Sequence, residues 1–180
     1  MRPSPAKEKL LESASALFYE DGIGATAVDD VVRAAGVSKP TLYAHFGSKA
    51  ELVAAVLDRR HAARAAELEA RDGGPLAVFE WLAEFYAREG VRGCAFVNAA
   101  AELTTPGPGR AAAAREKAWL RAELMRRARE AGLRAPERLG SQLALLVDGV
   151  AARVVVDGHG AAAGAVDDAA AAARALVAAA

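Results

Sequence analysis

Several residue types are scarce in this chain of 180 residues, and each scarcity narrows the class of protein. Cysteine occurs once, at Cys94, so no internal disulfide can form. The three histidines and this cysteine lie far apart in sequence, which gives no metal-ligand spacing. We therefore expect no metal and no cofactor. The charged N-terminal residues contain no apolar signal core, so we expect a cytoplasmic protein.

An excess of charge of one sign is also missing, because 23 Lys and Arg residues balance 23 Asp and Glu residues. A strongly basic chain would indicate a nucleic-acid partner, and zero net charge removes that indication without excluding the partner. Hydrophobic residues make up 53% of the chain, but alanine supplies about half of them. The alanine-rich stretches are short and flanked by charges, far from the roughly 20 apolar residues of a membrane span. We expect no membrane partner.

The abundant residues favour helices. Alanine is the strongest helix former, and Glu, Arg and Leu support it, whereas Val and Ile are sparse. Apolar residues recur at helical spacing between glycine and proline breaks. The sequence therefore predicts an all-α fold of about nine helices, with 158–164 expected to interrupt the pattern. The expected helices span about 5–21, 26–35, 39–46, 49–71, 76–89, 94–103, 110–131, 136–156 and 166–178.

Residues 26–49 carry the most informative local pattern. Thr26 and Asp29 have the spacing of a capping box, which starts a short helix that ends at Gly36. Ser38 is the expected N-cap of a second helix of only about two turns. A helix this short needs neighbours to hold it. The pair has the spacing of a helix-turn-helix, in which the second helix enters the major groove of DNA.

The charges of this segment agree with that interpretation. Residues 31–50 contain no Asp or Glu, although they include Arg33, Lys39, His45 and Lys49. The local charge is therefore positive while the total charge is zero. Hydroxyl groups in the same window, together with helix N-terminal N–H groups, are suited to phosphate binding.

Residues 5–57 resemble the DNA-binding domain of the TetR (tetracycline repressor-like) family of bacterial regulators. The run Gly-Val-Ser-Lys-Pro-Thr-Leu-Tyr-Ala-His-Phe-Gly-Ser-Lys-Ala-Glu-Leu is the most specific part of the match. The resemblance implies an N-terminal three-helix helix-turn-helix domain and a larger C-terminal helical effector and dimerisation domain. It places the DNA-binding domain at 1–48, a connecting helix at 49–71 and the C-terminal domain at 72–180. Other matching residues are Ala16-Leu-Phe18, Gly22 and Thr26.

The resemblance also implies which residues contact double-stranded DNA. Side chains 39, 40 and 45 would meet bases, while Thr26, Tyr43 and Lys49 resemble phosphate contacts. Structural alternatives remain for each: Tyr43 packing on Phe46, His45 or Thr26 acting as a cap, and the two lysines being merely solvated. Leu42 and Phe46 are expected in the core. The complete DNA-contact set is Thr26, Ser38, Lys39, Pro40, Thr41, Tyr43, His45 and Lys49.

The last two predicted helices have narrow apolar faces with small residues, which allow close approach of a second chain. Family members generally act as homodimers that bind an operator with two-fold symmetry, so these faces are expected to form the dimer interface. The alternative is that they are ordinary intramolecular core. The expected interface residues are Leu139, Leu143, Leu146, Val150, Val154 and Leu176.

The segment Gly93–Glu102 resembles a subgroup of TetR-like regulators, and aromatic residues surround it in sequence. An apolar chamber for a small-molecule effector, with one polar anchor, is the resulting hypothesis. The alternative is that the aromatic stripes are core. Cys94 fits a small buried filler better than a redox sensor. The expected ligand-binding residues are Phe79, Phe85, Tyr86, Phe96, Asn98 and Trp119.

These expectations combine into a ligand-responsive transcriptional repressor that binds DNA as a homodimer and is released by a small apolar or amphipathic molecule. One alternative keeps DNA binding but makes the C-terminal domain an interaction module without a ligand. A cavity near Phe85, Phe96 and Asn98 would favour the sensor. An enzyme is not expected, because the sequence contains no nucleophile–base pair, glycine-rich phosphate loop or metal cluster.

Overall fold

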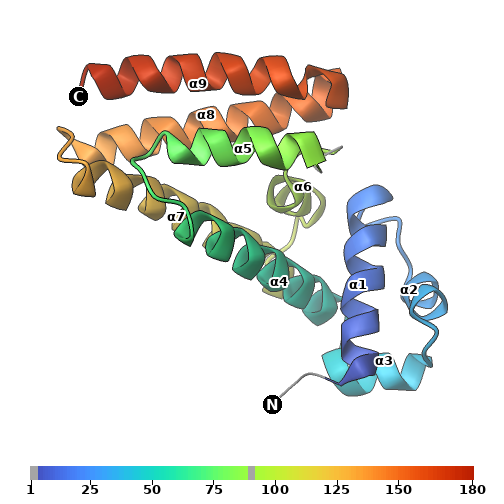
Figure 1. Ribbon diagram of the computed structural model, residues 1–180. Helices are drawn as coiled ribbons and strands as arrows, with labels where there is room; N and C mark the ends of the chain where they lie inside the picture. The colour runs from blue at the N-terminus through green and yellow to red at the C-terminus, as the bar shows by residue number, and fades with distance from the viewer. Residues whose placement is uncertain (1–3, 89–91) are drawn as a thin grey trace. The chain divides into compact units, whose positions relative to one another are not determined.

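The computed structural model describes residues 4–88 and 92–180, and within these ranges it contains nine α-helices, one short 3₁₀ turn and no strand (Figure 1). The predicted all-α fold is confirmed. The helices are α1 (Pro5–Glu20), α2 (Val28–Ala35), α3 (Lys39–Phe46), α4 (Lys49–Glu69), α5 (Ala77–Arg88), α6 (Ala95–Glu102), α7 (Pro108–Glu130), α8 (Pro136–Asp157) and α9 (Ala162–Ala178), with the 3₁₀ turn at His159–Ala161.

The chain forms two compact units. The first unit comprises Met1–Ala62 and Asn98–Ala114, and the second comprises Ala63–Val97 and Arg115–Ala180. Three helices, α4, α6 and α7, contribute residues to both units. The domain boundaries expected at residues 48 and 71 come from the family plan and stay a prediction.

The first unit begins with α1, whose start follows from its sequence. The Ser4 hydroxyl accepts a hydrogen bond from the backbone N–H of Lys7 at 3.2 Å, and Pro5 stands at the first helical position. Leu10, Ala14 and Phe18 then recur on one face and are buried. The predicted helix and its apolar face are confirmed.

The start of α2 differs from the prediction. Its N-cap is Ala27, whose backbone N–H donates to the Asp30 carboxylate at 3.0 Å. Thr26 is buried, and its hydroxyl donates to the carbonyl of Gly22 at 2.7 Å. The predicted capping box of Thr26 with Asp29 is therefore wrong by one residue: the helix starts after Ala27, and buried Thr26 lies in the connector that its hydroxyl stabilises.

The next two helices start as expected. The Ser38 hydroxyl accepts from the backbone N–H of Thr41, and the Ser48 hydroxyl accepts from that of Glu51 at 3.2 Å. Between α2 and α3, Gly36 adopts φ 62°, a left-handed conformation in which a side chain would be strained. This turn sets the direction of α3, so the helix-turn-helix geometry depends on it.

The second unit has one continuous apolar core. In Figure 1, α8 and α9 run side by side, and α5 also packs against α9. Buried aromatic and aliphatic side chains from α5, α7, α8 and α9 meet here, as the periodicity predicts. The core includes Val78, Phe79, Trp81, Leu82, Tyr86, Leu120, Leu124, Leu139, Leu143, Val147, Val150, Val154, Val166 and Ala173.

This core corrects the expected dimer residues. Leu139, Leu143, Val150 and Val154 are buried within the unit itself and have no surface left for a second chain. Leu146 and Leu176 are half-buried at its margin. The predicted stripe is the inner face of α8, so the alternative of intramolecular core holds for these four residues. Helical periodicity identifies an apolar stripe but does not say whether the same chain or another covers it.

The start of α9 is also earlier than expected. Gly158 has φ 85° and closes α8, a 3₁₀ turn follows, and α9 begins at Ala162 rather than near residue 166. Residues 162–164 are therefore helical, because alanine favours the helix once the glycine break has been passed. The end expected for the fifth helix, Glu89, lies outside the described residues.

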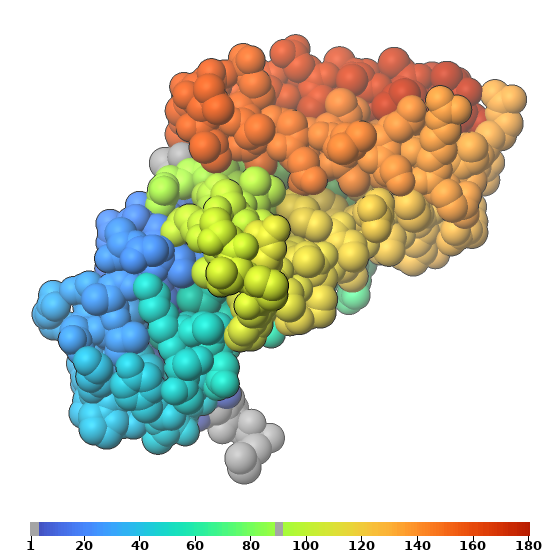
Figure 2. All heavy atoms as spheres, turned by 180° about the vertical axis from the view of Figure 1, so that it is seen from behind, coloured from blue at the N-terminus to red at the C-terminus, as the bar shows by residue number. Residues whose placement is uncertain are grey.

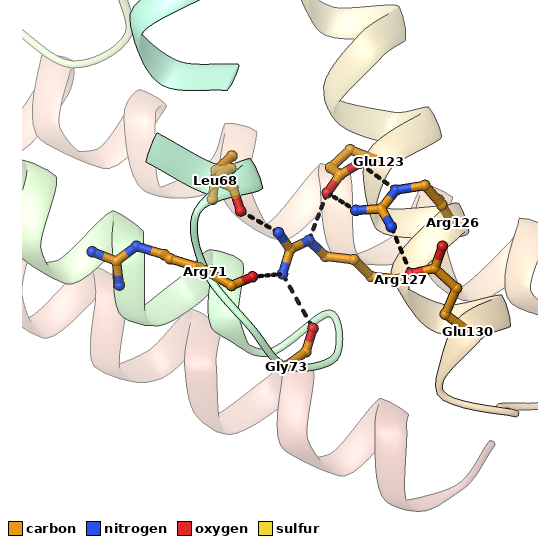
Figure 3. Close-up of polar contacts among 7 residues, drawn as sticks. All are labelled: Leu68, Arg71, Gly73, Glu123, Arg126, Arg127 and Glu130. Atoms are coloured by element: carbon orange, nitrogen blue, oxygen red, sulfur yellow. Dashed lines mark hydrogen bonds and ion pairs between the residues drawn. The ribbon is translucent and has the colours of Figure 1, made fainter. Parts of the chain in front are cut away.

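A buried arginine on α7 closes the C-terminal end of α4 (Figure 3). The Arg127 guanidinium donates to the carbonyl oxygens of Leu68, Arg71 and Gly73, at 3.2 Å for Arg71 and 3.1 Å for Gly73. Its Nε donates to the Glu123 carboxylate at 2.6 Å. Carbonyls in the last turn of a helix lack intrahelical partners, and this side chain supplies one to Leu68 and also holds the two carbonyls that follow the helix.

The same carboxylate is shared with a second arginine. Arg126 donates to Glu123 at 2.5 and 2.8 Å and to Glu130 at 2.5 Å. The hydrogen bond from Arg126, supported by Arg127, lowers the pKa of the Glu123 carboxyl. Arg126 thus holds the Glu123 carboxylate in place, and this carboxylate in turn holds the guanidinium of Arg127.

We predict that Arg127→Met destabilises the second unit by about 3 kcal/mol, because the buried carbonyl of Leu68, two part-buried carbonyls and the Glu123 carboxylate lose their donor. Arg129→Met, two residues along the same helix, is the control, since Arg129 is exposed and should leave the unfolding free energy nearly unchanged. Urea titration followed by tryptophan fluorescence measures both, because Trp81 and Trp119 lie in the second unit. Equal effects of the two variants would contradict the capping role.

Candidate nucleic-acid interface and buried polar cluster

Helix α3 presents one face to solvent and the other to the core. Ser38, Lys39, Pro40, Tyr43 and His45 are exposed, and Thr41 is half-buried. Leu42 and Phe46 are buried, as the sequence predicts. Two inward residues on two turns are enough to fix the helix against α1 and α2, which leaves its outer face free to meet a partner.

The N-terminal end of α3 carries two linked hydroxyl groups. Ser38 Oγ and Thr41 Oγ1 lie 2.7 Å apart, and the backbone N–H of Thr41 donates to Ser38 at 3.3 Å. The structure thus brings Ser38 and Thr41 together at a helix N-terminus, where N–H groups and the helix dipole favour anions. A phosphate group is the anion that such a hydroxyl pair suits.

Lys39 is paired within the protein. Its Nζ lies 2.9 Å from the Asp29 carboxylate on α2, and the hydrogen bond that the lysine donates to Asp29 raises the pKa of the lysine. Arg33 is likewise paired with Asp30 at 2.8 Å. The acid-free window of residues 31–50 is therefore less positive in the fold than in the sequence, since α2 brings in two aspartates that immediately precede it.

The other expected DNA contacts fall into two groups. His45 and Lys49 have internal partners: His45 Nε2 lies 3.2 Å from the Ser4 hydroxyl, and Lys49 Nζ donates to the Ile23 carbonyl at 2.5 Å. His45 thus joins the end of α3 to the start of α1. Tyr43 is exposed, which disfavours the alternative of packing on Phe46. Thr26 is buried and uses its hydroxyl internally, so we leave it out of the proposed contact set.

Glu102, at the end of α6, lies outside the predicted set of site residues. Its carboxylate accepts from the backbone N–H of Gly24 at 2.9 Å, in the connector between α1 and α2. Arg110 donates to the carbonyls of Ala100 and Leu103 and so caps the same helix. Only the fold could reveal this contact, because Glu102 and Gly24 are 78 residues apart.

The second unit contains a buried polar cluster. The Arg64 guanidinium donates to the Glu116 carboxylate, and it lies 4.8 Å from the Trp81 ring centre and 5.5 Å from that of Phe96. Both charged side chains are almost fully buried. Burial lowers the pKa of Arg64, but Cys94 and Glu116 raise it by more, so the pKa lies above its ordinary value.

A second ion pair adjoins the first. Lys117 Nζ lies 2.5 Å from the Asp148 carboxylate and 3.9 Å from Oε2 of Glu116. Burial lowers the pKa of Lys117, while Cys94 and the two carboxylates raise it by more. Cys94 is buried beside these groups, as expected for a small filler. Oε2 of Glu116 has no hydrogen-bond partner among the described residues.

The structure separates the expected ligand-binding residues. Phe79, Phe85, Tyr86, Phe96 and Trp119 belong to the second unit, whereas Asn98 belongs to the first. Phe79 and Tyr86 are part of the apolar core. A hollow of about 330 Å³ adjoins this set at Tyr86, between α5 and the start of α9, with His159 on its wall. The aromatic stripe is thus largely core, the alternative that the sequence left open.

The first unit has the features of a helix-turn-helix DNA-binding protein: two short helices joined through a left-handed glycine, and a hydrogen-bonding outer face on the second. The description "Bacterial regulatory proteins, tetR family" matches residues 10–56. A crystal structure of a tetR-type transcriptional regulator (sav143) from Streptomyces avermitilis is 35% identical, and the match covers 96% of this chain and 99% of that one with a TM-score of 0.77. The chain therefore belongs to the tetR family, as its sequence motifs indicate.

Curated relatives match over shorter stretches. The regulator TtgR of Pseudomonas putida is 40% identical over 68 residues, which are 35% of this chain and 32% of the relative. The transcriptional activator FasR of Mycolicibacterium smegmatis is 51% identical over 51 residues, 28% of this chain and 23% of the relative. The chain thus matches about a third of the length of these relatives or less, and both are transcriptional regulators rather than enzymes.

We predict that Asp29→Asn tightens binding to duplex DNA several-fold and steepens its salt dependence by about one counterion, because Lys39 gains a free charge beside the DNA. Asp72→Asn, an exposed aspartate in the second unit, makes the same change of net charge and is the control. Fluorescence anisotropy at several salt concentrations measures both. The interpretation fails if the two variants bind DNA equally.

Proposed function

We propose that this chain is a one-component transcriptional repressor that binds an operator with two-fold symmetry as a homodimer and releases it when a small molecule binds the second unit. The proposed location is the bacterial cytoplasm. The observation that carries the DNA-binding part is the outer face of α3, where side chains with hydrogen-bonding groups are exposed around a capped helix N-terminus. The relatives include an activator, so repression is the more specific part of the proposal.

The exposed side chains on and beside α3 are proposed to have two different roles in DNA binding. Ser38, Thr41 and Tyr43 offer hydroxyls to phosphates, which fix the position of the helix on the duplex. Lys39, Pro40 and His45 are proposed to face base edges, and Lys39 must exchange Asp29 for DNA to do so. Lys49 keeps two N–H donors beyond the one that Ile23 accepts, so it also contributes positive charge.

We predict that Tyr43→Phe weakens DNA binding by a similar factor, about two- to tenfold, for the operator and for unrelated duplexes, because one neutral hydrogen bond to phosphate is lost. The salt dependence should stay unchanged, since a hydroxyl displaces no counterion. The operator is first selected in vitro from random duplexes with the purified protein, and anisotropy then compares the variants.

Tyr19→Phe, on α1 of the same unit, is the matched control for the loss of a phenol hydroxyl. Wild-type affinity of the Tyr43→Phe protein, or a loss confined to one DNA sequence, would remove the phosphate role. Selected sites without two-fold symmetry would contradict the proposed dimeric reading.

The outer faces of α8 and α9 support a homodimer. Leu145 and Val156 on α8 are 71% and 80% exposed, which is unusual for large apolar side chains. A groove of about 700 Å³ lies between the two helices and is floored by small residues, including Gly149 and Gly164. In Figure 2 the atoms of α8 and α9, orange to red, lie next to one another at the surface. A two-fold contact would let the exposed side chains of each copy fill the groove of the other.

The hydropathy of α8 agrees with this arrangement. The helix is long and apolar enough to cross a membrane by length and composition, yet only 39% of its most apolar window is buried. A second copy of the chain would cover the exposed part of this apolar window. The proposed interface is therefore the face opposite to the buried stripe that the periodicity first indicates.

We predict that Leu145→Glu shifts the protein from dimer to monomer, raising the dimer dissociation constant at least tenfold, because each interface would gain two buried carboxylates. Ala118→Glu, at an exposed position of α7, is the control for added charge. Analytical ultracentrifugation measures the mass against 18.6 kDa per chain, and circular dichroism checks folding. A Leu145→Glu protein that stays dimeric would contradict this interface.

Two observations bear on the effector. The buried aromatic residues Phe79, Trp81 and Tyr86 fill core positions, which is what a packed module without a ligand would also show. The unsatisfied oxygen of Glu116 favours a ligand site, because buried polar groups are nearly always hydrogen-bonded. A ligand can regulate DNA binding only if it binds the two conformations with different affinity.

A further inference from the structure

Glu116 is the most unusual side chain of the second unit. Its carboxylate has no exposed surface, and its Oε1 accepts from Arg64. Oε2 is equally buried but accepts no hydrogen bond from the described residues. Leaving a charged acceptor unsatisfied costs more than leaving a neutral one. The unsatisfied Oε2 of Glu116 therefore points to a bound molecule that donates a hydrogen bond to it.

The surroundings of this oxygen define the donor. Lys117 Nζ lies 3.9 Å from Oε2, too far for a hydrogen bond between them. Two atoms at this separation can both be reached by one oxygen placed about 2.8 Å from each. A hydroxyl is suited to that position, because its O–H donates to the carboxylate while its lone pair accepts from the ammonium.

Charge balance excludes an ion as the natural occupant. Arg64 and Lys117 are matched by Glu116 and Asp148, so the cluster has no net charge for a ligand to neutralise. The cluster also has apolar walls, because the rings of Trp81 and Phe96 flank the guanidinium. An apolar body next to a hydroxyl therefore fits the cluster better than a polar molecule does.

Access is possible from one side. The side chain of Lys117 is 24% exposed, whereas that of Glu116 is fully buried. The cluster thus has a buried floor of Glu116, Arg64 and Cys94 and a partly open rim of Lys117 and Asp148.

We propose that the second unit binds a neutral alcohol or phenol whose hydroxyl bridges Glu116 Oε2 and Lys117 Nζ. This inference rests on the proposed function, because it names the chemical class of the effector. Glu116 is the specificity-determining acceptor, and Lys117 is the complementary donor. Ethers and hydrocarbons of the same shape bind more weakly, since neither can donate to Oε2.

A buried water is the competing occupant, because it also offers a hydroxyl. A water needs about three hydrogen-bond partners to be held firmly in a protein interior. The cluster offers it Oε2 and an ammonium that is already bonded to Asp148, while the aromatic rings offer none. A phenol that displaces such a water keeps both hydrogen bonds and adds the burial of its ring.

The test compares 4-ethylphenol with 4-ethylanisole, which replaces the O–H by O–CH₃, by isothermal titration calorimetry on the full chain. The wild-type protein should bind the phenol at least about tenfold more tightly, as expected for a hydrogen bond to a charged acceptor. In Glu116→Gln the amide oxygen must still accept from Arg64, which turns the NH₂ toward the ligand. The preference should then shift at least about tenfold toward the ether, since the site now donates.

Glu80→Gln, on the exposed side of α5, is the matched control and should keep the wild-type preference. If Glu116→Gln does not fold, Lys117→Met serves in its place, because it removes the donor from a partly exposed residue. It should weaken the binding of both probes several-fold, because both oxygens accept from the ammonium, and keep the preference for the phenol that Glu116 sets. A wild-type protein that binds both probes equally, or neither up to their solubility limit, overturns the proposal.

Operator release, followed by fluorescence anisotropy, distinguishes the failure of this inference from that of the proposed function. If the phenol binds through Glu116 and the operator stays bound, the site stands and its regulatory role is wrong. If apolar molecules release the operator with no preference for a hydroxyl, the sensor stands and the hydroxyl site is wrong.

Discussion

The cap that Arg127 provides for α4 is the interaction on which the second unit depends. Helix α4 ends at Glu69, and one guanidinium donates to the buried carbonyl of Leu68 in its last turn and to the carbonyls of Arg71 and Gly73 in the segment that follows. A lysine could not do so, because the fork of Arg127 reaches three acceptors while its Nε holds Glu123. The end of α4 and the middle of α7 are thereby fixed to one another. The aromatic and aliphatic core then packs against α4 and α7, whose polar groups at this point are already hydrogen-bonded.

Local features of this fold follow from the sequence, and long-range pairs do not. Ser4, Ser38 and Ser48 cap their helices, and a cap of this kind depends only on residues three positions away. Thr26 does not cap α2, because the helix starts one residue later and the threonine is buried with its hydroxyl bonded to Gly22. The positive window of residues 31–50 is partly neutralised by Asp29 and Asp30, which no count within the window could include. Charge in sequence is therefore only a first approximation to charge at a surface.

The apolar stripe of α8 shows the same limit. Periodicity identifies Leu143, Val150 and Val154 as apolar and aligned, and the fold uses them for its own core. The residues that remain for a second chain, Leu145 and Val156, lie outside the regular pattern. In the sequence, a helix that is apolar on both sides shows one regular apolar stripe and a few apolar residues outside it. Which side faces inward is decided by the partners α5 and α9, and their positions are set by the tertiary fold.

A ligand can regulate DNA binding only if ligand binding and DNA binding depend on the same conformational change. Helix α4 begins with Lys49, which donates to the connector after α1, and ends at the carbonyls that Arg127 caps. Helix α6 begins next to Cys94 and ends with Glu102, which accepts from Gly24 in the same connector. Both helices contribute residues to both units. A ligand at Glu116 can change DNA affinity only through its different fit to two arrangements of these helices, and a coupling of about 1–3 kcal/mol is sufficient for a switch of that kind.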